Sequence, residues 1–254
     1  MESVTVGGLS IGTGRPKLIV PITAESKAEL LQAAQAVRHS PAQLAEWRLD
    51  RFELVTRKES LLDAAQALCA ALGDLPVLAT YRTVKEGGGG VISETQYAAL
   101  IETLADSGLV DLIDIELFTG EDFVRREISY CHEKGVKVIL SSHDFARTPP
   151  KEEMTARLRR MEALGADIAK LAVMPQTPED VLTLLSATSE VSATAARPVV
   201  TMSMGRLGAV SRIAGEVFGS ALTFGAVGQS SAPGQLEAAA LAKALSLLSP
   251  EENA

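Results

Sequence analysis

A lysine and a histidine lie near the ends of two successive apolar segments of the chain. Lys170 lies inside the apolar run of residues 167–174, and His143 lies at the end of residues 138–144. Burying an unpaired ammonium is so unfavourable that a buried lysine tends to lose its proton. The neutral amine can then form a Schiff base with a carbonyl substrate, and an imidazole nearby can serve as general base. This pair, at equivalent ends of successive strands, predicts an active site.

On the neighbouring predicted strands, further residues that could line a binding site stand two apart. Residues two apart on a strand share a face. The pairs that share a face are Glu46 and Arg48, Thr80 and Arg82, Asp114 and Glu116, Ser141 and His143, and Met202 and Met204. If these faces point inward, charges of both signs meet Lys170 in one place. Such a cluster is costly to bury and predicts a polar pocket, and its arginines predict an anionic substrate such as a carboxylate.

Each of these residues also has a simpler interpretation, which stays open at this point. Lys170 could form a buried ion pair with Asp114 or Glu116, and His143 could cap a strand end. The four glycines after Glu86 lack the Gly-Lys-Ser/Thr ending of a phosphate loop, and we interpret them as a flexible loop that presents Glu86. The scattered histidines and cysteines offer no metal-ligand spacing, so we expect neither a metal nor a cofactor.

Short apolar segments alternate with amphipathic ones along the whole chain. The predicted strands are 17–23, 45–49, 76–82, 110–117, 137–143, 167–173, 198–203 and 221–227. The predicted helices are 25–38, 58–72, 94–107, 121–133, 152–164, 178–190, 210–218 and 233–248. Proline at 178 and at 233 suits a first helical turn.

This alternation predicts an α/β fold, a closed (β/α)8 TIM barrel, because the number of units and the 254 residues both fit that fold. An open doubly wound sheet is the second choice, but no G-x-G-x-x-G follows the first strand. We expect a single domain over residues 1–254. Its barrel would span 15–250, and a hairpin within 1–14 would close the bottom, opposite the chemistry.

Composition narrows the class of partner. The formal net charge of -8 argues against a nucleic-acid partner. Residues 2–8 show no signal-peptide pattern and the sequence contains no long apolar run, so we expect no membrane partner. Cys69 and Cys131 are far apart and form no CxxC motif, which favours a reducing compartment and a cytoplasmic location.

A series of short motifs makes the chain resemble a known family over residues 4–248. The motifs are Glu46-Trp-Arg-Leu-Asp50, Tyr81-Arg-Thr-Val-Lys-Glu-Gly-Gly88, Ser142-His-Asp-Phe145, Lys170-Leu-Ala-Val-Met-Pro175, Thr201-Met-Ser-Met204, Ser211-Arg212, Gly215-Glu-Val-Phe-Gly219, Phe224-Gly225 and Ala232-Pro-Gly-Gln235. In order and spacing they resemble type I 3-dehydroquinate dehydratase, the Schiff-base enzyme of the shikimate pathway, which leads to chorismate and the aromatic amino acids.

The resemblance implies the syn elimination of water from 3-dehydroquinate to give 3-dehydroshikimate, without a cofactor, in a homodimer. It implies that Lys170 forms the Schiff base, that His143 is the proton donor and acceptor, and that Glu86 orients His143. It implies that Arg212 holds the substrate carboxylate. The other substrate-binding residues that it implies are Glu46, Arg48, Arg82, Met202, Met204, Phe224, Ser231 and Gln235.

One departure from the family and two alternative functions remain. Pro21 stands where some relatives carry a serine, and because proline offers no donor there we assign it no contact. One alternative is another Schiff-base barrel lyase of the aldolase or transaldolase kind, which would cleave a carbon–carbon bond. The other is a ligand-binding barrel without catalysis, in which the lysine or the base would be lost, yet both are present. Asp114 has no fixed role beyond charge balance or proton relay.

Overall fold

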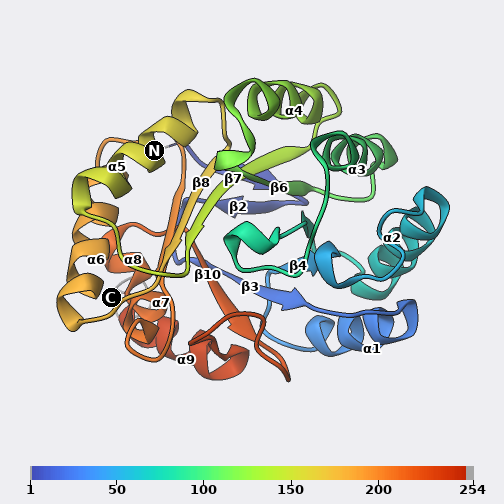
Figure 1. Cartoon of the computed structure of the whole chain (residues 1–254). Helices are drawn as coiled ribbons and strands as arrows, with labels where there is room; N and C mark the ends of the chain where they lie inside the picture. Colours follow the sequence, from blue (N-terminus) through green and yellow to red (C-terminus); the bar gives the residue numbers. More distant parts are fainter. Residues whose placement is uncertain (1, 250–254) are drawn as a thin grey trace.

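The computed structural model describes residues 2–249, in which a ring of helices surrounds a curled parallel sheet (Figure 1). The sheet strands are β3 (Lys17–Ile22), β4 (Leu44–Arg48), β5 (Val77–Thr80), β6 (Leu112–Glu116), β7 (Lys137–Asp144), β8 (Ile168–Val173), β9 (Val199–Ser203), β10 (Leu222–Ala226) and the short β11 (Leu236–Glu237). The helices are α1 (Lys27–Arg38), α2 (Lys58–Leu72), α3 (Glu94–Ser107), α4 (Glu121–Glu133), α5 (Lys151–Ala163), α6 (Pro178–Ser192), α7 (Ala209–Ile213), α8 (Gly215–Phe218) and α9 (Ala238–Leu248).

The sheet closes on itself, which confirms the predicted (β/α)8 barrel. Neighbouring strands from β3 to β9 pair in parallel in chain order, and β10 returns to pair with β3. A bridge between Val199 and Ser220 joins the last gap, where the Ala221 N–H donates to the Val199 carbonyl at 2.8 Å. The open sheet considered from sequence is therefore excluded.

The barrel interior changes from apolar to polar along its axis. Its lower layer takes one buried apolar side chain from each strand, namely Ile19, Leu44, Leu78, Leu112, Ile139, Ile168, Val200 and Leu222. Two residues further along each strand, the inward positions hold Pro21, Glu46, Thr80, Asp114, Ser141, Lys170, Met202 and Phe224. Because side chains alternate across a strand, the polar layer faces the same interior as the apolar one.

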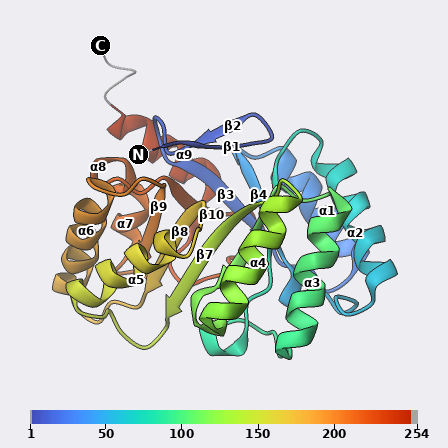
Figure 2. The same cartoon turned by 90° about the horizontal axis from the view of Figure 1, so that it is seen from above.

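A hairpin covers the apolar end of the barrel, as predicted (Figure 2). Strands β1 (Val4–Val6) and β2 (Leu9–Ile11) pair in antiparallel fashion, and Val4, Val6 and Ile11 pack into the interior cluster. The two glycines between the strands both have positive φ, which glycine adopts without strain. The carboxyl ends of the barrel strands lie opposite this hairpin and stay available for a binding site.

Helix α6 begins where its sequence predicts. The C-terminal part of the chain differs from the prediction. The Thr177 side chain caps α6 with Pro178 in its first turn. In contrast, Pro233 does not begin a helix. Residues 236–237 instead add β11 beside β10, and Glu237 caps α9 by accepting from two backbone N–H groups. The predicted helix 210–218 is divided into α7 and α8, and the predicted strand 76–82 is shortened to β5.

The predicted domain limits and the expected absence of a membrane span can be compared with the structure only over residues 2–249. The predicted limits of the hairpin and the barrel at residues 1, 250 and 254 lie outside the described residues. Within residues 2–249, no helix has the length and apolarity needed to cross a membrane.

Candidate active site

One cavity at the carboxyl ends of the strands collects the residues that the sequence singled out. Its lining includes Glu46, Arg48, Arg82, Glu86, His143, Lys170, Met202, Met204, Arg212, Phe224, Ser231 and Gln235, which is every catalytic and substrate-binding candidate named from sequence. Residues 231, 232 and 235, from the loop after β10, also line it, and the free volume is about 50 Å³. The loop therefore forms part of the pocket wall in this structure.

Lys170 is buried among two carboxylates and an aromatic ring. Its side chain is 5% exposed, and its Nζ lies 3.2 Å from Asp114 Oδ2 and 3.8 Å from Glu46 Oε1. Nζ also lies 4.6 Å from the centroid of the Phe224 ring. The proton that Nζ must lose before it can attack a carbonyl therefore has an acceptor within hydrogen-bond distance.

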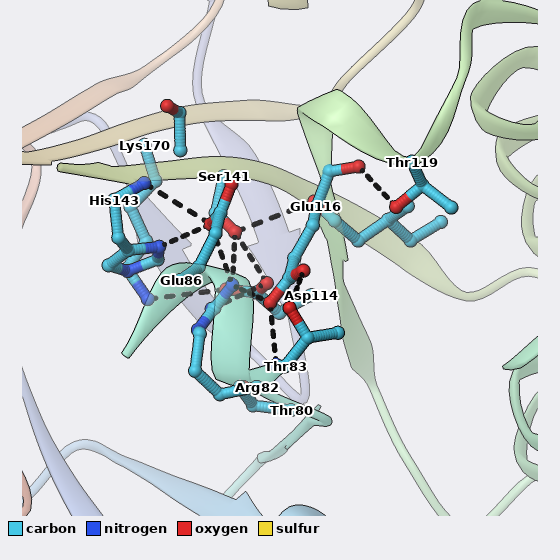
Figure 3. A network of polar contacts seen from close by, with 12 residues as sticks. Thr80, Arg82, Thr83, Glu86, Asp114, Glu116, Thr119, Ser141, His143 and Lys170 are labelled. Atoms are coloured by element: carbon cyan, nitrogen blue, oxygen red, sulfur yellow. Dashed lines mark hydrogen bonds and ion pairs between the residues drawn. The ribbon is translucent and has the colours of Figure 1, made fainter. Parts of the chain in front are cut away.

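Arg82 is the centre of the polar network beside Lys170 (Figure 3). Its Nη2 donates to Asp114 at 2.7 Å, and its Nη1 contacts Glu116 at 3.0 Å and Glu86 at 3.3 Å. Ser141 joins the network by donating to Asp114 at 2.6 Å. The carboxylates raise the pKa of Arg82 above its ordinary value although burial opposes this, so Arg82 is a fixed cation.

Glu86 and His143 form a close pair on the other side of Arg82. His143 Nδ1 lies 2.9 Å from Glu86 Oε2, and the His143 backbone N–H donates to the same oxygen at 3.2 Å. Nδ1 is therefore engaged by Glu86, which leaves Nε2 as the ring nitrogen for chemistry.

Burial and neighbouring charges shift both members of this pair. Burial, together with the carboxylates of Glu116 and Asp114, raises the pKa of Glu86 to about 8 against the opposing charge of Arg82. Burial and the positive charges of Arg82, Lys170 and Arg48 lower the pKa of His143 well below its ordinary value. Burial thus disfavours the charged form of each member of this pair in the ligand-free site.

The glycine loop after Glu86 is tied down rather than loose. The N–H groups of Gly88 and Gly90 donate to the carbonyls of Thr83 and Arg82 at 2.8 and 3.0 Å. A Cβ on Gly88 would lie 2.1 Å from the Arg82 carbonyl oxygen, so only glycine permits this close approach. The turn Val84–Glu86 (a 3-10 helix) is held in place, contrary to the flexible loop expected from sequence.

Asp50 connects this loop to Arg48 in the pocket. Its carboxylate accepts from Arg48 Nε at 2.8 Å and Nη2 at 3.0 Å, a bidentate pair. The same carboxylate accepts from the Gly89 and Arg82 backbone N–H groups. The charge of Arg48 lowers the pKa of Asp50 in spite of burial, so the brace between β4 and the loop after β5 is ionised at neutral pH.

Arg212 is a buried cation that contacts no carboxylate within residues 2–249. Its Nη1 and Nη2 donate to the carbonyls of Phe224 and Pro233 at 3.4 and 3.2 Å, and its Nε has no partner. Burial lowers the pKa of Arg212 to about 10. A buried guanidinium of this kind at a cavity wall can bind an anion.

Comparisons with known proteins show which family the chain belongs to. Residues 18–252 match the family model described as type I 3-dehydroquinase. A 3-dehydroquinate dehydratase of Salmonella agona (strain SL483) is 50% identical over 249 residues, which cover 98% of this chain and 99% of the relative. The chain belongs to the type I 3-dehydroquinase family.

Solved structures of this family share the whole barrel. The type I 3-dehydroquinate dehydratase of Clostridium difficile, described as carrying covalently modified comenic acid, has a TM-score of 0.95 and 45% identity, with coverage of 97% of this chain and 98% of that chain. The 3-dehydroquinate dehydratase of Geobacillus kaustophilus HTA426 has a TM-score of 0.95 and 40% identity, with coverage of 97% and 96%. A carboxyl transferase domain of Rhizobium etli pyruvate carboxylase, at 13% identity, shares the fold alone.

Sequence reasoning missed several residues of this 3-dehydroquinase site. Thr80, Phe145 and Ala172 also line the cavity, and Ser141 and Asp50 stabilise its charged residues. The alternation of β5 and β7 already placed Thr80 and Ser141 on the inward face, which was the available signal. Asp50 lies one residue beyond the predicted strand 45–49, and its contacts with Gly89 and Arg82 depend on how the loop after β5 folds. Among residues 2–249, no group of three or more His, Cys, Asp or Glu could hold a metal ion.

Proposed function

We propose that the protein converts 3-dehydroquinate to 3-dehydroshikimate through a Schiff base on Lys170. The observation that carries this proposal is the buried Lys170 amine in one cavity with the Glu86–His143 pair. Lysine and histidine have separate partners there, which allows a nucleophile and a base to act on one substrate. Membership of the type I 3-dehydroquinase family supports the same reaction.

The reaction divides into steps that these residues can perform. Lys170 attacks the ring ketone and, with loss of water, forms an iminium ion. The iminium acidifies the adjacent carbon, and His143 removes a proton from it through Nε2 to give an enamine. The enamine then expels the hydroxyl, which takes the proton of the imidazolium and leaves as water, so that a conjugated iminium forms. A second water hydrolyses this iminium to release the product and Lys170. Glu86 holds Nδ1 throughout, so that the same ring nitrogen handles each proton.

The remaining cavity residues bind and enclose the substrate. Arg212 binds the carboxylate, because it is a buried cation in the pocket wall and has no anionic partner in the described part of the chain. The polar groups of Glu46, Arg48 and Arg82 bind the ring hydroxyls. Three apolar residues, Met202, Met204 and Phe224, pack against the ring, while Ser231 and Gln235 cover it.

Turnover tests this function directly. The protein incubated with 3-dehydroquinate should produce the absorbance of a conjugated enone, and Lys170→Ala should abolish it while leaving the protein folded. Carbon–carbon cleavage products would support the aldolase alternative, and binding without turnover would support the ligand-binding barrel. No enone from the unmodified protein would overturn the proposal.

The same proposal includes the setting of the enzyme. We place it in the shikimate pathway, in the cytoplasm and as a homodimer, with residues 15–250 as one barrel domain behind the hairpin of residues 1–14. Cys69 and Cys131 are free, which is compatible with a reducing compartment. Sedimentation of the purified protein tests the dimer, and a monomer at working concentration would contradict it.

A further inference from the structure

Glu116 is a buried carboxylate that the proposed reaction leaves without a role. It ends β6, and its side chain is 5% exposed. The cavity that holds Lys170 does not include Glu116 in its lining. Its contacts instead run to the segment that carries Glu86 (Figure 3).

Two sets of contacts connect Glu116 with Glu86. Glu116 Oε1 accepts from Arg82 Nη1 at 3.0 Å, the same nitrogen that contacts Glu86 Oε2 at 3.3 Å. Glu116 also accepts from the Thr83 backbone N–H at 2.9 Å and from the Thr83 hydroxyl at 2.7 Å. Thr83 directly precedes the turn that ends in Glu86, so the contacts of Glu116 with Thr83 hold this turn in place. Glu116 and Glu86 also contact the same cation, Arg82.

The state of Glu86 decides whether His143 can accept a proton. When Glu86 is a carboxylate, Nδ1 donates to it and Nε2 has a free lone pair. When the pair takes up one more proton, Nδ1 is still engaged by Glu86 and Nε2 carries a proton. The form with one proton is thus the base, and the form with two protons is the acid that serves the departing hydroxyl.

We infer that Glu116 is a positioning residue that competes with Glu86 for Arg82 and thereby sets the pH below which His143 stops acting as a base. This inference rests on the proposed function. A carboxylate beside Glu86 stabilises the pair with two protons in two ways, since it repels a second negative charge and withdraws part of the Arg82 charge. Removing that carboxylate should therefore extend activity to lower pH.

Other charged groups face Glu86, and they allow the effect of Glu116 to be isolated. Arg82 precedes it on the same segment, Asp114 faces it from β6 and His143 from β7. Lys170 on β8 and Arg48 on β4 line the same cavity. These groups are unchanged in a Glu116 variant, and Glu116 does not line the cavity with the substrate, so a shift in the pH profile reports on Glu116 alone.

The experiment compares the pH dependence of kcat/KM in three proteins. Glu116→Gln removes the charge and keeps an oxygen that can accept from the Thr83 N–H, and its acid limb should move down by on the order of one pH unit. Thr83→Val removes only the hydroxyl contact, so its limb should stay close to that of the unmodified protein. Glu121→Gln, the same change at an exposed site on α4, serves as control and should leave the profile unchanged.

Each outcome has a distinct meaning. A lower acid limb in Glu116→Gln alone supports the inference. An equal loss of kcat/KM at every pH, with the limb in place, means a merely structural role and overturns it. Glu116→Met is a second uncharged variant and must show the same shift if Glu116→Gln does not fold. Absence of turnover in the unmodified protein would instead overturn the proposed function, so the two failures are distinguishable.

Discussion

At the scale of the residue, the two buried arginines of the site differ in whether carboxylates surround them. Arg82 contacts Asp114, Glu116 and Glu86, whereas the Arg212 guanidinium, among the residues that the structure describes, contacts carbonyl oxygens and a sulfur atom but no carboxylate. A buried cation that lacks an anion is costly, and a bound carboxylate would remove that cost. The difference between the two arginines therefore separates a cation whose charge is already paired from one that can pair with a substrate carboxylate.

Replacement of Arg212 tests this difference. Arg212→Gln keeps polar donors but removes the charge, so KM should rise on the order of 100-fold while kcat falls much less. Steady-state kinetics measures both constants. Arg160→Gln, at an exposed ion pair with Glu121, is the matched control and should change neither. An unchanged KM in Arg212→Gln would place the carboxylate elsewhere in the cavity.

Residue types and two-residue spacing predicted much of this site. They placed Glu46, Arg48 and Lys170 on inward faces, and the structure brings these residues to one cavity. They did not predict the partners of each charge. Which carboxylate contacts Lys170, and that Asp50 braces Arg48, depend on distances across strands and on a loop conformation that no local pattern determines.

At the scale of the element, the segment after β5 shows how a loop without regular structure can be rigid. Its glycines are required by close approach, since a Cβ at Gly90 would lie 2.4 Å from the Tyr81 ring and one at Gly88 would lie 2.1 Å from the Arg82 carbonyl oxygen. The sequence suggested flexibility because glycine is unconstrained in isolation. Tertiary contacts remove that freedom here.

Adjacent glycines in this loop provide a matched pair of variants. Gly88→Ala should destabilise the protein by more than about 1 kcal/mol and lower kcat, because the loop must move and carries Glu86 with it. Gly89→Ala should be tolerated, since its Cβ meets nothing closer than Arg51 Cζ at 3.4 Å. Thermal unfolding and kcat measure the two effects. Equal behaviour of the two variants would contradict the rigid-loop interpretation.

The element boundaries that the sequence misjudged have a common cause. Pro233 resembles the start of a helix, but residues 236–237 extend the sheet beside β10 before α9 begins. Pairing with a neighbouring strand overrode the local signal. The strands and helices far from the cavity, where hydrophobic spacing alone decides, were predicted within a few residues of their observed ends.

At the scale of the whole molecule, the barrel separates stability from chemistry along its axis. The lower layer is apolar and covered by the hairpin of β1 and β2, while the charged layer lies toward the opposite end. We therefore expect a change in one layer to have little effect on the other. This arrangement explains how a barrel can tolerate so many buried charges in its upper half.

A substitution in the lower layer tests this separation. Ile139→Ala removes a side chain that is 0% exposed and should lower the free energy of unfolding by about 2–5 kcal/mol. The kcat/KM of the folded protein should change little. Leu182→Ala on the surface of α6 should alter stability by less than about 0.5 kcal/mol. A large loss of kcat/KM in folded Ile139→Ala would show that the layers are coupled.

The measurement that tests the central claim most directly is borohydride reduction of the protein in the presence of 3-dehydroquinate, followed by peptide mapping. Borohydride converts an iminium to a stable amine, so the account predicts one adduct per chain, carried by the peptide that contains Lys170 and lost in Lys170→Ala. Turnover without any trapped adduct, or an adduct on another lysine, would contradict it.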